Sequence, residues 1–111
     1  MSGNAPDEAQ IRQRMNSLGV KFVRRTLGEL AELQELLAKA RAGDAAAVRE
    51  MEVMAHKIHG TGATFGFTGI SECAGKIEYL AVPVFDASSA NQVQEHLKQL
   101  QVELARVAGD A

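Results

Sequence analysis

Two histidines that stand three residues apart, His56 and His59, are the side chains of this chain best suited to covalent chemistry. A histidine can accept a phosphoryl group on a ring nitrogen and pass it on, provided that the attacking nitrogen carries a lone pair. An exposed imidazole is mostly neutral near pH 7, so it meets this condition. We therefore take His56 as a candidate phosphoacceptor. The residues around it determine whether its side chain reaches solvent.

The residues on both sides of His56 predict a helix that is packed into a bundle. Apolar or small residues recur there at spacings of three and four, which is typical of the buried side of such a helix. They are Val48, Met51, Ala55, Ile58, Gly62 and Phe65. Because His56 follows Ala55, a rotation of about 100° per residue turns its side chain away from the core. The pattern therefore predicts an exposed imidazole on an anchored helix.

Small and partly apolar residues share the face of His56. Val53 lies about one turn before it, and Gly60 and Ala63 lie one and two turns after it. Glycine inside a helix costs about 1 kcal/mol relative to alanine, so Gly60 and Gly62 are expected where another structure approaches closely. We predict a flat docking surface of Val53, Gly60 and Ala63, against which a partner protein presses its active site.

This stretch resembles the signature of histidine-containing phosphotransfer (HPt) domains. In that signature a histidine is followed by any residue, an aliphatic residue, a basic residue, a glycine and further small residues. The matching residues are His56, Lys57, Ile58, His59, Gly60, Thr61, Gly62 and Ala63. The resemblance covers roughly residues 20 to 82: Phe22 and the leucines after it resemble the preceding helix, and Ile70, Ala74, Ile77 and Glu78 resemble the next helix.

The resemblance implies a histidine phosphocarrier of a multistep two-component phosphorelay, without autokinase activity. His56 would accept a phosphoryl group from the aspartyl phosphate of a response-regulator receiver domain or a hybrid histidine kinase. It would then pass the group to another receiver aspartate. We expect no cofactor in this chain, because Glu52 is the one acidic residue a turn before His56 and the next residue on that face is Arg49. Mg²⁺ is expected only in the partner receiver domain.

The chain departs from the family at His59, where the family usually carries a lysine. That lysine is thought to neutralise charge on the phosphoryl group. Imidazole can donate a hydrogen bond but is only partly cationic near neutrality, so His59 is expected to act as a pH-dependent replacement. Helix pairing offers a second cation, Arg25, level with residues 61–64, and Phe22 nearby to help the partner dock. A purely solvated helix face explains Arg25 equally well.

Two functions of other classes remain open. One is a helical-bundle adaptor that binds signalling partners without phosphotransfer, since the fold alone does not determine function. The replaced lysine favours this alternative, whereas the presence of His56 argues against it. The other is a metal site at His56 and His59. It lacks a matching acidic motif, Cys73 falls on an inward-facing stripe, and His96 is expected at the surface, so no metal ligand is assigned.

Composition describes an ordinary globular domain. The 111 residues are 46% hydrophobic and 23% charged, which fits a single domain spanning residues 1–111. A net charge of −2 gives no case for nucleic-acid binding. The single cysteine excludes an internal disulfide, and no apolar run approaches the ~20 residues that cross a bilayer. We expect a monomer in the cytoplasm, without membrane contact.

The fold class predicted from the pattern is all-α, an antiparallel four-helix bundle with a short additional N-terminal helix. Residues 1–6 are expected to be frayed. The short helix would run from Pro6 to about residue 16, and Gly19 would separate it from a second helix over residues 20–41. The inner stripe of that second helix is predicted to be Val23, Leu27, Leu30, Leu33, Leu37 and Ala40.

The later helices follow from their boundary signals. A short link at residues 42–44 makes the second helix antiparallel to the third, which carries His56 and ends near Gly66. Thr68 is the predicted N-cap of the fourth helix, and Pro83 stops it. After a loop over residues 83–88, Ser89 and Gln92 form a predicted capping box for the last helix.

Overall fold

Four helices make up the part of the chain that the structure, a computed structural model, describes, which is residues 7–109. They are α1 (Glu8–Arg41), α2 (Ala45–Thr64), α3 (Thr68–Leu80) and α4 (Ala87–Gly109), and no strand occurs within these residues. The predicted all-α bundle is therefore confirmed. The expectation for residues 1–6 falls outside the described residues.

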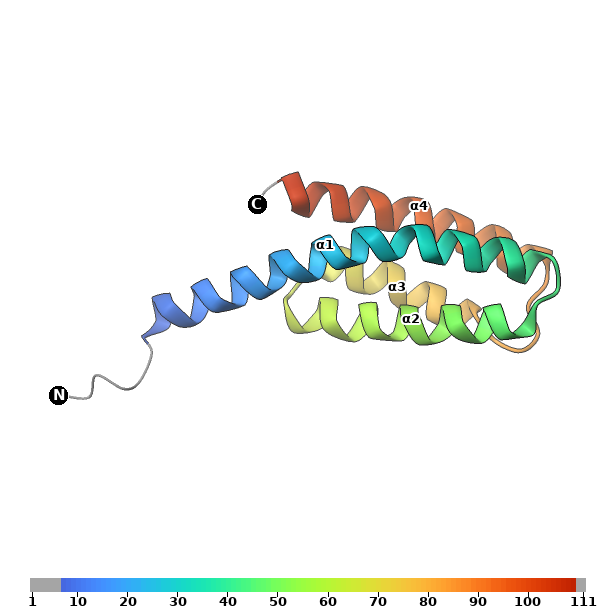
Figure 1. Cartoon of the computed structure of the whole chain (residues 1–111), viewed down its shortest axis with the longest axis horizontal. Coiled ribbons are helices and arrows are strands. Elements are labelled where there is room, and N and C mark those ends of the chain that lie inside the picture. The colour runs from blue at the N-terminus through green and yellow to red at the C-terminus, as the bar shows by residue number, and fades with distance from the viewer. Residues whose placement is uncertain (1–6, 110–111) are drawn as a thin grey trace.

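The helices form a ring in which each packs against two neighbours (Figure 1). α2 lies between α1 and α3, and α4 closes the ring between α3 and α1. Aliphatic side chains from all four helices meet in the centre, as their three-and-four spacing predicts. The largest fully buried side chains are Thr26, Leu33, Met51, Ile58, Ile70, Ile77, Val93, Leu100 and Leu104.

The short N-terminal helix is not a separate element, and this expectation was wrong. α1 runs without interruption from Glu8 through Gly19, and Asp7 caps its start in a capping box with Gln10. Gly19 is retained inside the helix because a Cβ there would lie 3.2 Å from the ring of Phe67. A close packing contact, rather than a break, therefore explains this glycine. The first turns of α1 project beyond the other three helices (Figure 1).

Three smaller expectations also need correction. Leu27 is 38% exposed, and Thr26 takes its inward place by donating its hydroxyl to the carbonyl of Phe22 at 2.8 Å. Thr68 is the first residue of α3 rather than its cap. Asp86, not Ser89, caps α4, because its carboxylate accepts hydrogen bonds from both the amide and the hydroxyl of Ser89.

The link between α1 and α2 is as short as the sequence predicts. Gly43 adopts a φ of +96°, which a residue without a side chain tolerates best. Asp44 caps α2 by accepting from the amides of Ala46 and Ala47 at 3.0 and 3.2 Å. The tight turn makes α1 and α2 antiparallel neighbours and fixes the start of the helix that carries His56.

Candidate functional site

His56 lies on the exposed side of α2, and its side chain is 71% exposed. On the opposite side of the helix, Ala55 and Ile58 are buried at 0% and 2% exposure. The exposure predicted from the helical spacing is therefore confirmed. A buried stripe holds the helix against the bundle, and the imidazole stands in solvent.

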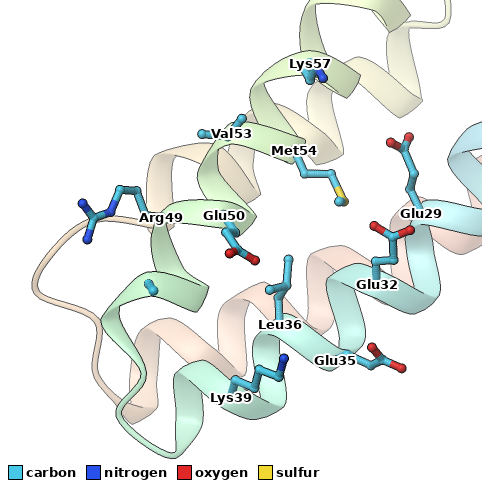
Figure 2. Close-up of a pocket in the computed structure, with 11 residues that line it drawn as sticks. Glu29, Glu32, Glu35, Leu36, Lys39, Arg49, Glu50, Val53, Met54 and Lys57 are labelled. Atoms are coloured by element: carbon cyan, nitrogen blue, oxygen red, sulfur yellow. The ribbon is translucent and has the colours of Figure 1, made fainter.

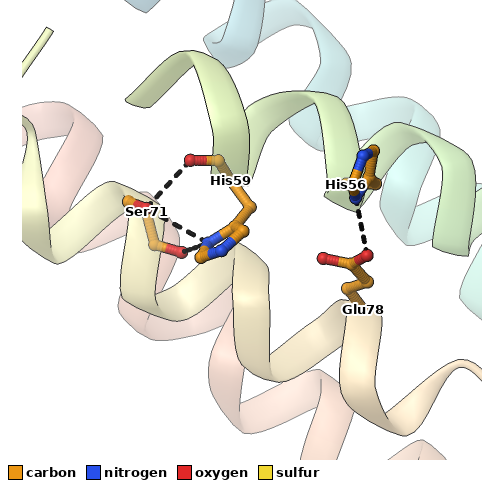
Figure 3. A network of polar contacts seen from close by, with 4 residues as sticks. All are labelled: His56, His59, Ser71 and Glu78. Carbon is orange, nitrogen blue, oxygen red and sulfur yellow. Dashed lines mark hydrogen bonds and ion pairs between the residues drawn. The ribbon is translucent and has the colours of Figure 1, made fainter. Parts of the chain in front are cut away.

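One ring nitrogen of His56 is held by a carboxylate from the neighbouring helix (Figure 3). Nδ1 lies 2.7 Å from Oε2 of Glu78 on α3. A carboxylate only accepts hydrogen bonds, so Nδ1 carries the proton and donates it. In the neutral ring the lone pair is then on Nε2. Nε2 has no hydrogen-bond partner within residues 7–109, so the nitrogen that carries the lone pair is the one that no other side chain engages.

A close approach of α2 to α3 brings Glu78 to His56. A Cβ on Gly62 would meet the backbone nitrogen of Ser71 at 3.3 Å, so glycine lets the two backbones come together there. Because the helices run antiparallel, two turns forward along α3 from Ser71 correspond to about two turns back along α2 from Gly62. This step leads to Glu78 on one helix and His56 on the other.

His59 is tied to the same helix by its own ring (Figure 3). Its Nδ1 lies 2.8 Å from the carbonyl oxygen of Ser71 and 3.1 Å from the Ser71 hydroxyl oxygen. The hydroxyl in turn donates to the backbone carbonyl of His59 at 2.9 Å. Because a carbonyl cannot donate, Nδ1 of His59 carries the proton. His59 therefore links α2 to α3, a role that the sequence did not indicate.

The ring of His59 fits against a glycine on α3. A Cβ at Gly75 would lie 2.9 Å from Nδ1 of His59, which leaves no room for a larger residue without moving the ring. His59 is half-buried in this position. That His59 neutralises charge on a phosphoryl group at His56 stays a prediction. The geometry leaves only Nε2 of this ring for such a contact, since Nδ1 is engaged by Ser71.

The residues predicted to form the docking surface are exposed. Val53 is 55% exposed, and Gly60 and Ala63 are also at the surface. A Cβ at Gly60 would have no atom within 4 Å, so this glycine faces open space. The surface beside His56 is therefore low, as predicted, and its use by a partner stays a proposal.

Phe22 does not belong to a docking surface, and that prediction was wrong. It is only 4% exposed, because its ring packs in a cluster with Phe65 and Phe67, at centroid distances of 6.0 and 6.1 Å. The contact with Phe65 confirms that this part of α1 is level with the end of α2. An aromatic residue at this level holds α1 to the turn between α2 and α3 instead of reaching a partner.

Arg25 is exposed and pairs within its own helix. Its guanidinium lies 3.9 Å from the carboxylate of Glu29, one turn further along α1. Within residues 7–109 it makes no hydrogen bond or ion pair to α2. A role of Arg25 at the phosphoryl group therefore rests on position alone.

The sequence missed the apolar residues that flank Glu78. Tyr79 is 82% exposed, and Val82 is 40% exposed. Both line a shallow depression together with Glu52 and Glu78, so they border the His56 site from the α3 side. Their place beside Glu78 and His56, unlike their exposure, depends on the register between the two helices, which no local pattern specifies.

The described residues offer little for a metal or a membrane. No group of three or more His, Cys, Asp or Glu side chains within residues 7–109 has a geometry that could hold a metal ion. His56 contacts Glu78, and His59 contacts Ser71, so the two histidines are directed to different partners. In the same part of the chain, every helix is too short or too polar to cross a membrane.

Among known proteins, a family matches this chain, but no individual protein does. No curated protein and no solved structure matches it. The Hpt domain family matches residues 21–110, a range that contains His56, Glu78 and nearly all of the bundle. Hpt domains are helical bundles that carry phosphoryl groups on histidine in phosphorelays and interact there with receiver domains and kinases. The chain belongs to the Hpt domain family.

Proposed function

We propose that this chain is a phosphocarrier that accepts a phosphoryl group on Nε2 of His56. The single observation that carries this proposal is the 2.7 Å contact between Nδ1 of His56 and the carboxylate of Glu78. It holds the proton on Nδ1 and leaves the lone pair on the exposed nitrogen. A nucleophile oriented by a hydrogen-bonded acid is the arrangement that histidine catalysis uses elsewhere.

The transfer step follows from this geometry. The lone pair of Nε2 attacks the phosphorus of an aspartyl phosphate on the partner, a bond forms between Nε2 and phosphorus, and the bond from phosphorus to the aspartyl oxygen breaks. The aspartate leaves as a carboxylate. The ring of His56 becomes cationic, with its proton still on Nδ1, and the negative charge of Glu78 stabilises it. The reverse step passes the phosphoryl group to another receiver aspartate.

The partner we propose is a receiver domain, either free or part of a hybrid histidine kinase. Phosphoryl transfer needs position and charge neutralisation more than covalent help from the protein. Val53, Gly60 and Ala63 would let the receiver approach Nε2, and the receiver would supply the Mg²⁺ and the aspartate. Nε2 of His59 would add partial positive charge when that ring is protonated.

A helical adaptor without phosphotransfer is the alternative function. It is favoured by the contact of His59 with Ser71, since the ring at the position of the family's lysine is engaged in packing α2 against α3. An adaptor would bind the same receivers on the same surface. It would not become labelled, and this difference separates the two functions.

The test uses receiver domains labelled on their aspartate with radioactive phosphate. Each is mixed with the wild-type chain, with His56→Gln, and with His96→Gln as a matched control on α4. We expect acid-labile label on the wild type and the control, and none on His56→Gln. Label on His56→Gln would refute the site. Binding of receivers without transfer of label would favour the adaptor.

A second measurement removes the dependence on a matched receiver. Phosphoramidate is a small donor that phosphorylates exposed histidines without a docking partner. We expect it to label His56 of the wild-type chain. If this small donor left His56 unlabelled while labelling the half-buried His59 or His96, the assignment of Nε2 as a free nucleophile would be wrong.

A further inference from the structure

The outer face of α1 carries two apolar residues that no part of the described chain covers. Ile11 is 48% exposed and Leu18 is 50% exposed, and both lie on the N-terminal half of α1. The first turns of this half project beyond the other helices (Figure 1). Ile11 and Leu18 are seven residues apart, so they lie on one side of the helix. Arg14 lies three residues after Ile11, and Lys21 lies three residues after Leu18, so both cations are on the same side of the helix. An apolar stripe with cations on an unpacked helix is typical of an interaction surface.

The charge of this face reverses halfway along α1. Residues 9–28 contain no acidic residue, and three of their cations continue the spacing of Ile11 and Leu18, namely Arg14, Lys21 and Arg25. Residues 29–36 contain Glu29, Glu32 and Glu35 and no cation. The same spacing of three and four continues from the first half into the second, so basic and acidic halves follow one another on one face. Such a face is complementary to itself when two copies run in opposite directions.

The acidic half borders a groove between α1 and α2 (Figure 2). Glu29, Glu32 and Glu35 line it from α1, and Leu36 and Met54 give it an apolar part. Figure 2 shows Leu36 on α1 and Met54 on α2 on facing sides of this groove. Lys39, Arg49 and Lys57 also line the groove, so its negative charge is confined to Glu29, Glu32 and Glu35 along α1 and to Glu50 on α2. This acidic edge on α1 is the counterpart of the basic residues on the N-terminal half of the same helix.

We propose that this face pairs with the same face of a second copy of the chain, with the two α1 helices antiparallel. When the two-fold axis lies at the level of Val23, Arg14 of one copy faces Glu32 of the other. In the same register Leu18 faces Gly28, which is exposed. A Cβ at this position would have no other atom within 4 Å. A side chain of the second copy can therefore lie over Gly28 without a clash.

The register also determines how the remaining charges meet. Glu35 of one copy comes opposite Ile11 of the other, next to Arg14. Lys21 of one copy comes opposite Arg25 of the other near the axis, but each Arg25 lies 3.9 Å from Glu29 of its own helix, which offsets the repulsion. The pairing runs along nearly all of α1, which has 34 residues. At 1.5 Å per residue this is about 50 Å, enough for the ~800 Å² per partner that a stable interface buries.

This dimer leaves the contact of His56 with Glu78 uncovered, although Val53 of the docking surface also lines the groove beside the paired α1 helices. α2 lies between α1 and α3, and the contact of His56 is with Glu78 on α3. The pairing therefore goes beyond the proposed function and does not depend on it. The proposal is a two-fold dimer, in place of the monomer expected from the sequence, in which His56 of each copy remains accessible.

Analytical ultracentrifugation over a wide concentration series tests the pairing with the full chain. We expect a dimer whose dissociation constant rises with salt, because screening weakens the contacts between opposite charges. Arg14→Glu and Glu32→Arg should each raise that constant by at least about ten-fold, since each places like charges at two symmetric contacts. Lys98→Glu, a charge reversal on the exposed side of α4, is the control. Circular dichroism confirms that each variant folds.

Mixing the two variants is the decisive step. The Arg14→Glu variant has glutamate at positions 14 and 32, and the Glu32→Arg variant has arginine at positions 14 and 32. In a mixed dimer each glutamate therefore faces an arginine, which restores two contacts between opposite charges. We expect the mixture to dimerise about as well as the wild type. A wild type that stays monomeric at all concentrations would overturn the proposal and assign the face to another protein. A dimer that is unaffected by both variants would overturn it as well, because it would use another surface.

Discussion

Nδ1 of His56 on α2 and Oε2 of Glu78 on α3 are 2.7 Å apart, although 22 positions separate the two residues in the sequence. This contact determines which nitrogen of the ring is free, and it does so from a different helix. In the proposed transfer the phosphoryl group joins Nε2, whereas Glu78 contacts Nδ1 on the other side of the ring. We therefore predict that Glu78 acts through the imidazole, as a positioning residue.

Replacing Glu78 should slow transfer without abolishing it. In Glu78→Ala the ring loses its fixed tautomer and the charge that stabilises its cationic form, so we expect phosphoryl acceptance to fall by about ten-fold. Glu78→Gln keeps an acceptor but loses the charge, and it should fall between Glu78→Ala and the wild type. Single-turnover rates measure the effect, and ¹⁵N chemical shifts of the ring report the tautomer. Unchanged shifts together with unchanged rates would contradict the positioning role.

Two glycines near the histidines should respond in opposite ways to alanine. Gly60→Ala adds a methyl group in open space, so it should stabilise the fold by about 0.5–1 kcal/mol through helix propensity. Gly75→Ala would displace the ring of His59 from Ser71, so we expect it to be less stable than Gly60→Ala by about 1–2 kcal/mol. Urea unfolding monitored by circular dichroism compares them. Equal stabilisation by both substitutions would show that the contact of His59 with Ser71 contributes nothing.

A bulky charge at Gly60 should block the receiver without damaging the nucleophile. We expect Gly60→Arg to lower the rate of transfer from a receiver by at least about ten-fold, because the new side chain stands in the approach to Nε2. Labelling by phosphoramidate should stay near the wild-type rate. Ala105→Arg, on the exposed side of α4, serves as the matched control. Should Gly60→Arg exchange phosphate with receivers as fast as the control, the surface around His56 is not where they dock.

The exposure of His56 could be predicted because it depends on its own helix alone. The spacing that buries Ala55 and Ile58 also turns His56 outward, and a local pattern is enough to show this. The contact with Glu78 could not be predicted in the same way. Periodicity tells which face of a helix is buried, but not which residue of the neighbouring helix lies at the same level.

The two errors at α1 have a common physical cause. Gly19 has low helix propensity, which predicted a helix break, and Phe22 was predicted to dock a partner because helix pairing placed it near the level of residues 61–64. In the structure the ring of Phe67 packs against both of them. Tertiary packing at the end of the bundle thus overrides the local preference, and it involves a residue that lies more than forty positions away in the sequence.

The stability of the bundle should depend on pH through His96 on α4. Burial lowers the pKa of His96 below its ordinary value of 6.5, repulsion from Lys76 on α3 lowers it further, and Glu95 opposes both effects. His96, Lys76 and Glu72 line one shallow depression between α3 and α4. The pKa of His96 is lower in the folded chain than in the unfolded chain. Between these two pKa values the unfolded chain binds more protons, so the free energy of unfolding rises with pH in this range.

Substituting His96 isolates this contribution from that of the other histidines. His96→Gln cannot be protonated, so the difference in unfolding free energy between the wild type and this variant should change across the window. Above pH 6.5 the imidazole is neutral in both the folded and the unfolded wild-type chain. Below the lowered pKa the folded wild type carries a desolvated imidazolium beside Lys76, so its free energy of unfolding, measured relative to that of His96→Gln, should be smaller there. Urea titrations at a series of pH values give both curves. Curves that run parallel from acid to neutral pH would show that His96 takes up its proton equally in the folded and unfolded chains.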